Sequence, residues 1–94
     1  MAQLQPVTTK ATVTTHSSEQ SLTLQPGYTQ ARIKNRNKGA IHWAWKAGQS
    51  LNFGVVPAGT MQVIDVPTKY TGTAPVIYFT TFAAGDVFEI EHIN

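Results

Sequence analysis

The feature that most constrains the fold is an alternation of apolar and polar residues with a period of two. No long segment shows the apolar period of about 3.6 residues that marks an amphipathic helix. Turn residues recur instead roughly every 8–12 positions, which is typical of β-sandwiches and barrels. We therefore predict an all-β, single-domain antiparallel β-sandwich or jelly roll of about eight short strands.

The 94 residues suit one domain with one modest core. The expected strands lie near residues 7–15, 20–24, 29–36, 40–46, 50–56, 60–66, 75–82 and 86–93. Residues 1–19 are polar and rich in threonine, a residue that favours strands, and they contain Pro6. We expect this stretch to be an extended N-terminal arm or an edge strand.

Three expected strands end in two residues followed by a glycine, at 37–39, 57–59 and 83–85. This pattern predicts three-residue hairpin loops with the glycine in the left-handed conformation. A hairpin fixes which side chains share a face. The second loop predicts a common core face for Leu51, Phe53, Val55, Met61 and Val63. The third loop places Ile77 and Phe79 on the face that carries Glu89 and Glu91, which predicts an exposed apolar surface.

The stretch ARIKNRNKGAIHWAWK, residues 31–46, decides between two functional readings. A three-residue loop turns Trp43 and Trp45 inward, opposite Ile33 and Ala31. The cations that then face outward are Arg32, Lys34, Arg36 and Lys46. A two-residue loop would instead place Lys34 opposite Trp43 and build a ladder of cations and tryptophans. The Asn-Lys-Gly turn and the separation of charged from apolar residues favour the first arrangement.

Composition and spacing argue against catalysis, and we expect no enzyme, no cofactor and no metal site. The chain has no cysteine, and its three histidines are scattered without short ligand spacing. Asp65, Asp86, Glu89 and Glu91 give no isolated pair in an apolar pocket of the kind that acid–base catalysis requires, and no glycine-rich run precedes a helix. No apolar run approaches the roughly 20 residues of a spanning helix, and the N-terminus lacks the apolar stretch of a signal peptide. We therefore expect no membrane partner.

Charge is weakly polarised along the chain. Five of the seven basic residues fall within residues 32–46, and three of the five acidic residues fall within residues 86–91. The cationic stripe suits three interpretations: a solvated face that resists edge pairing, a docking face for an acidic protein surface, or a weak, salt-sensitive nucleic-acid contact. The candidate partner-binding residues are Arg32, Lys34, Arg36, Lys46, Ile77 and Phe79.

The second half of the chain, WKAGQSLNFGVVPAGTMQVIDVP followed by PVIYFTTFAAGDVFEIEHIN, resembles small auxiliary virion proteins of tailed bacteriophages. The resemblance covers about residues 40–94 and lies in cysteine-free, threonine-rich strands with PAGT-like and AAGD-like turns. It implies a sandwich or jelly roll that decorates a capsid or tail, often as a symmetric homo-oligomer. The implied partner is the major capsid or tail protein, and the implied location is the virion, assembled in the host cytoplasm. No site residue carries over.

The leading hypothesis is a non-enzymatic structural virion protein that binds and stabilises a capsid or tail surface. A carbohydrate-binding attachment module is the first alternative, motivated by Trp43, Trp45, Tyr70 and Tyr78. A small barrel that binds single-stranded nucleic acid is the second alternative, and it requires the ladder of cations and tryptophans.

Overall fold

The structure is a computed structural model that describes residues 7–12, 17–67 and 73–93. It confirms an all-β fold with eight strands in this part of the chain. The strands are β1 (Val7–Thr12), β2 (Gln20–Thr23), β3 (Gln30–Lys34), β4 (Ile41–Ala44), β5 (Gly54–Val56), β6 (Met61–Asp65), β7 (Val76–Thr80) and β8 (Val87–His92). A single-turn 3₁₀ helix, η1 (Ser50–Asn52), replaces the first part of the strand expected over 50–56.

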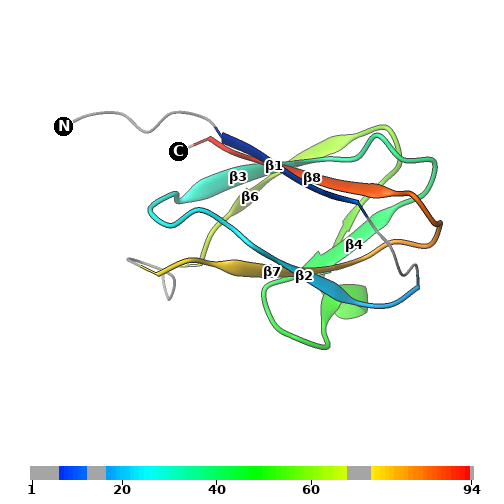
Figure 1. Ribbon diagram of the computed structural model, residues 1–94, viewed down its shortest axis with the longest axis horizontal. Helices are drawn as coiled ribbons and strands as arrows, with labels where there is room; N and C mark the ends of the chain where they lie inside the picture. The colour runs from blue at the N-terminus through cyan, green and yellow to red at the C-terminus, as the bar shows by residue number, and fades with distance from the viewer. Residues whose placement is uncertain (1–6, 13–16, 68–72, 94) are drawn as a thin grey trace.

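The strands form two antiparallel four-stranded sheets that pack as layers (Figure 1). Sheet A has the order β1-β8-β3-β6, and sheet B has the order β2-β7-β4-β5. The pairing is nested: β1 pairs with β8, β2 with β7, β3 with β6 and β4 with β5. Two four-stranded sheets with this wrapped pairing make a jelly roll, so the fold is a sandwich and not a barrel.

The three glycine turns are not hairpins, which corrects the sequence prediction. Strands β3 and β4, β5 and β6, and β7 and β8 each lie in different sheets, so each turn carries the chain from one sheet to the other. Gly59 and Gly85 have φ of +74° and +86°, the predicted left-handed conformation, but Gly39 does not. A left-handed glycine reverses the chain equally well within a sheet and between sheets, so turn chemistry alone did not distinguish the two.

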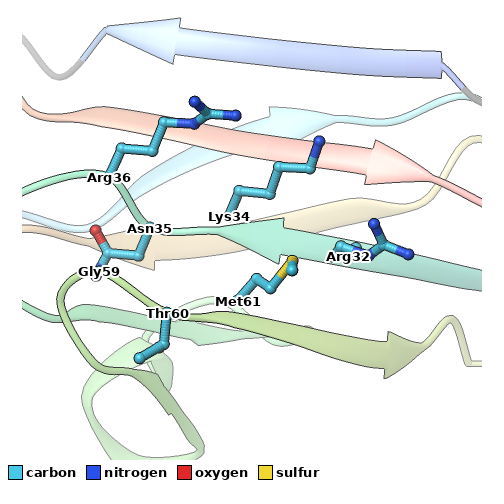
Figure 2. A pocket seen from close by; sticks show the side chains of 7 residues that line it. All are labelled: Arg32, Lys34, Asn35, Arg36, Gly59, Thr60 and Met61. Atoms are coloured by element: carbon cyan, nitrogen blue, oxygen red, sulfur yellow. The ribbon is translucent and has the colours of Figure 1, made fainter.

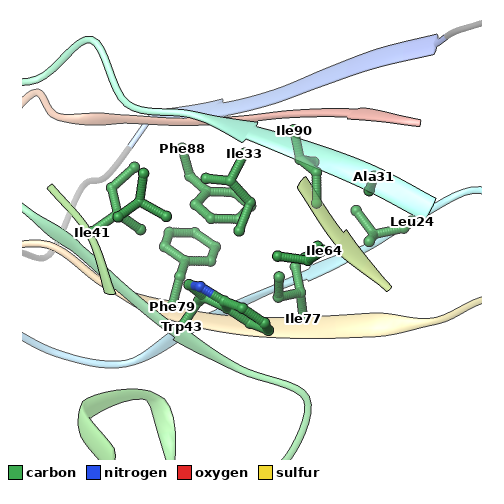
Figure 3. Packing of buried hydrophobic residues seen from close by; sticks show 11 residues of the cluster. Leu24, Ala31, Ile33, Ile41, Trp43, Ile64, Ile77, Phe79, Phe88 and Ile90 are labelled. Atoms are coloured by element: carbon green, nitrogen blue, oxygen red, sulfur yellow. The ribbon is translucent and has the colours of Figure 1, made fainter. Parts of the chain in front are cut away.

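The core lies between the two sheets and contains side chains from both (Figure 3). Its fully buried members include Ala31 and Ile33 of sheet A and Ile41 of sheet B, and Trp43 is 5% exposed. Phe79 of sheet B stacks on Phe88 of sheet A, with ring centroids 4.2 Å apart and planes at 9°. The predicted inward direction of Ile33 and Trp43 is confirmed, although the two residues face each other from opposite sheets.

Two expected apolar surfaces are reversed in the structure. Ile77 and Phe79, expected to be exposed, are 0% and 1% exposed and belong to the core. The predicted core face of Leu51, Phe53, Val55, Met61 and Val63 is exposed instead. The cause is common to both errors. When a turn crosses between sheets, the faces of its two strands are no longer related by hairpin register, and the hairpin count assigned the wrong sides.

Glu19 connects the start of β2 to the segment that precedes η1. Its Oε2 accepts a hydrogen bond from the Gly48 amide at 2.6 Å, and its Oε1 accepts one from the Ser50 amide at 3.0 Å. Burial raises the pKa of the Glu19 carboxyl, but hydrogen bonds from Gly48 and Ser50 to the ionised form outweigh burial and leave the pKa below 4.5. The ionised carboxylate therefore holds this loop in place.

We expect Glu19→Gln to flatten the pH dependence of stability on the acid side. A carboxyl with a lowered folded-state pKa stabilises the fold above its unfolded pKa, and this stabilisation is lost as pH falls through the folded pKa. The affected window thus begins near the ordinary value of 4.5 and extends below it. Urea unfolding of both proteins at several pH values between about 6 and 3 measures the difference. If the free energy of unfolding fell equally with pH in wild type and variant, Glu19 would make no such contribution.

Candidate functional site

The outer face of sheet A carries two rows of side chains that cross all four strands. The strand register aligns Thr8, Glu91, Arg32 and Val63 in one row, and Lys10, Glu89, Lys34 and Met61 in the next. Alternate residues of a strand point to the same side of the sheet, so both rows lie on the face away from the core. Arg32, Lys34 and Arg36 follow one another on this side of the chain, and we call them the basic face.

Carboxylates of β8 pair with the basic face. Glu91 lies 3.5 Å from both Arg32 Nη1 and Lys34 Nζ, and Glu89 lies 3.2 Å from Arg36 Nε. Glu89 is only 5% exposed; Arg36 is its ion-pair partner, and Lys34 lies opposite it in the strand register. The ion pairs partly neutralise the face within its own sheet. With Lys10, four cationic side chains share this side of the described strands with three carboxylates, Glu89, Glu91 and Asp65, so a small excess of positive charge remains.

A hollow of about 400 Å³ opens on the same face, where β3 ends and β6 begins (Figure 2). It is lined by Arg32, Lys34, Asn35, Arg36, Gly59, Thr60 and Met61. In Figure 2 the three cations extend one after another along β3, and Met61 and Thr60 form the opposite side. The Arg36 side chain is 75% exposed. The hollow thus offers guanidinium and ammonium donors beside an apolar thioether, which suits a carboxylate-bearing protein surface.

Lys46 does not belong to the basic face, although the sequence placed it there. It is exposed, but it lies two residues after the end of β4, a strand of sheet B and not of sheet A. The expected partner-binding role of Ile77 and Phe79 is also wrong, because both side chains are in the core. Of the predicted partner-binding residues, the structure brings together Arg32, Lys34 and Arg36 only.

The aromatic residues form a packed cluster, and they do not make a ladder with the cations. Trp43 is buried on the inner side of sheet B and meets Trp45 and Phe53 edge-on, at centroid distances of 5.8 and 5.1 Å. Lys34 lies opposite Glu89 and Met61 in sheet A. The arrangement required for the single-strand nucleic-acid alternative is therefore absent. Tyr70, one of the residues that motivated a carbohydrate site, lies outside the described residues.

Asn35 supports the hollow from below, and sequence reasoning did not single it out. It is 2% exposed, and its Nδ2 donates to the carbonyl oxygens of Gly39 and Val56 at 2.9 and 2.8 Å. Its Oδ1 accepts from the Asn37 amide at 2.9 Å. The Asn37 side chain in turn bonds both the amide and the carbonyl of Val87. Two asparagines two residues apart, at the end of a predicted strand, were the only available signal.

Metal-ligand groups and membrane-spanning helices are absent from the described part of the chain. Residues 7–12, 17–67 and 73–93 contain no group of three histidine or acidic side chains that could hold a metal ion. In the same ranges, no helix has the length and hydropathy to cross a membrane. Comparison of the chain with protein-family models, curated proteins and solved structures finds no match.

Proposed function

We propose that this protein is a non-enzymatic structural protein of a virus particle that docks its basic face on an acidic surface of the capsid or tail. The observation that carries the proposal is the basic hollow on sheet A, which is lined by Arg32 and Lys34 of β3 and by Arg36 just after it. The resemblance of residues 40–94 to auxiliary virion proteins of tailed bacteriophages supplies the kind of partner. The jelly roll is compatible with this role, because it occurs in viral capsid proteins, although it also occurs in lectins.

The arrangement of the basic face supports docking over a purely solvated surface. Side chains that serve only solubility are spread over a surface, whereas these three line one concave site with apolar Met61 beside them. The hydrogen bonds of Asn35 hold the floor of the hollow, so its shape is set before a partner arrives. The internal partners Glu89 and Glu91 keep the cations in place, and a denser acidic surface could compete for them.

The test is co-sedimentation of the purified full chain with purified particles from the cells that produce it, together with mass spectrometry of those particles. We expect the protein in the particles at a fixed copy number. Arg36→Gln should raise the Kd for particles stripped of this protein by roughly fivefold, equivalent to about 1 kcal/mol. The binding of wild type should weaken as salt rises from about 50 to 200 mM.

Lys46→Gln is the matched control, because it removes the same unit charge from an exposed residue that follows β4 of the other sheet. Its affinity should equal that of wild type. Absence of the protein from purified particles would refute the proposed function. If Arg36→Gln and Lys46→Gln lowered the affinity for particles equally, the assignment of the docking face would be refuted, because general charge attraction alone would then explain the binding.

A further inference from the structure

Strand β6 is an edge strand with an exposed apolar face, and its one charged residue, Asp65, lies at its end. It ends the order of sheet A in the described residues, and Met61 and Val63 are 62% and 52% exposed. No charged residue occurs from residue 47 to residue 64. The opposite edge strand, β1, carries Lys10. Because exposed apolar edge strands attract further strands, β6 is the open side of this sheet.

The backbone of β6 presents hydrogen-bonding groups on its free side. The Asn35 amide donates to the Thr60 carbonyl at 2.9 Å, and the Val66 amide donates to the Thr29 carbonyl at 2.8 Å. The Thr60 carbonyl, the Val66 amide and, by the alternation of an antiparallel ladder, the amide and carbonyl groups of residues 62 and 64 thus point toward β3. The groups of Met61 and Val63 must then point away from β3, toward an added strand.

We propose that a second copy of this chain pairs its β6 with this β6, antiparallel and with Gln62 on the two-fold axis. The register then places Met61 of each copy opposite Val63 of the other on the outer face, and Gln62 opposite Gln62. The backbone groups of residues 61 and 63 point away from β3, so in this register they can form hydrogen bonds between the two copies. The result is one eight-stranded sheet across two copies, and the inference does not depend on the particle-binding proposal.

Charge also favours a second copy as the occupant. In this register, exposed Asp65 of the second copy comes close to Gly59, at the edge of the basic hollow. A carboxylate is thereby brought near Lys34 and Arg36, which have the opposite charge. A register centred on Val63 would instead set Asp65 opposite Met61 and Gln62 opposite Ile64. These pairs match an acid and an amide with apolar side chains, so the Gln62-centred register is preferred.

Analytical ultracentrifugation of the full chain tests the dimer. Wild type should dimerise with a Kd in the micromolar range. Val63→Lys should raise that Kd at least about tenfold, because it replaces the apolar Val63–Met61 contact between the copies and places a cation of each copy at the shared edge. Val55→Lys is the matched control, since Val55 is an equally exposed valine (48%) on β5, the edge of sheet B. A wild type that stays monomeric at about 100 µM, or dissociation by Val55→Lys as strong as by Val63→Lys, would overturn the inference.

Disulfide trapping tests the register, and the absence of natural cysteines makes it unambiguous. Residues paired on the axis have Cα atoms about 4.5 Å apart, within the range of roughly 4.4–6.8 Å that a disulfide spans. We expect Gln62→Cys to form a covalent dimer at least about tenfold faster than Ser21→Cys, an exposed position on β2. Equal rates for these two variants, or faster trapping of Val63→Cys than of Gln62→Cys, would overturn the proposed pairing.

Discussion

Replacing Phe79 with alanine should lower the free energy of unfolding by about 3–5 kcal/mol. Phe79 is 1% exposed and stacks on Phe88 across the two sheets, so the truncation removes apolar contacts from both layers and leaves a cavity between them. A domain of this size is stable by only about 5–15 kcal/mol, so the variant should be close to unfolding at ambient temperature. Urea unfolding followed by far-UV circular dichroism measures the loss.

Phe82→Ala is the matched control for this prediction. Phe82 follows β7 in the same stretch of chain but is 49% exposed, and its ring meets only the edge of His42 at 5.4 Å among the described ring contacts. The same truncation there should cost less than about 1.5 kcal/mol. If both variants lost a similar amount of unfolding free energy, Phe79 would not join the two sheets as the structure indicates. The comparison also separates a core role for Phe79 from the exposed partner-binding role expected from sequence.

Replacing Asn35 should destabilise the fold almost as much, by about 2–4 kcal/mol for Asn35→Ala. The change leaves the carbonyls of Gly39 and Val56 and the amide of Asn37 without this partner in a site that is 2% exposed. Each of these buried polar groups would be removed from water without a hydrogen bond to offset that cost. Asn35→Asp should be at least as damaging at neutral pH, because a carboxylate cannot donate and would face two carbonyl oxygens.

Chemical unfolding of the two Asn35 variants measures this effect, and Asn52→Ala controls for the loss of an amide side chain. Asn52 is exposed, and its side chain reaches Gln49 at 3.4 Å on the surface. Its replacement should change stability by less than about 0.5 kcal/mol. If Asn35→Ala proved as mild as Asn52→Ala, the buried amide would not be what holds the turns of β3 and β5 together. Because Asn35 also lines the basic hollow, its variants should weaken particle binding too.

The local pattern predicted most of the secondary structure and part of the candidate site. Period-two alternation identified all eight strands, and it set Ile33 and Trp43 inward and Arg32 and Lys34 outward. These properties depend on a strand and its two faces, so neighbouring residues suffice to specify them. The cations pair with the carboxylates of residues 89 and 91 within sheet A.

Local sequence pattern therefore specifies an all-β chain of short strands with apolar and polar faces, together with a cluster of cations along one of them. The sheet that each strand joins depends on contacts between distant segments. That choice buried Ile77 and Phe79, exposed Met61 and Val63, and moved Lys46 away from the basic face. Alternation and turn chemistry act over a few residues, whereas jelly-roll pairing joins β1 to β8 and β2 to β7 across most of the chain. A turn that can close a hairpin or cross between sheets carries no information about which of the two the distant strands will select.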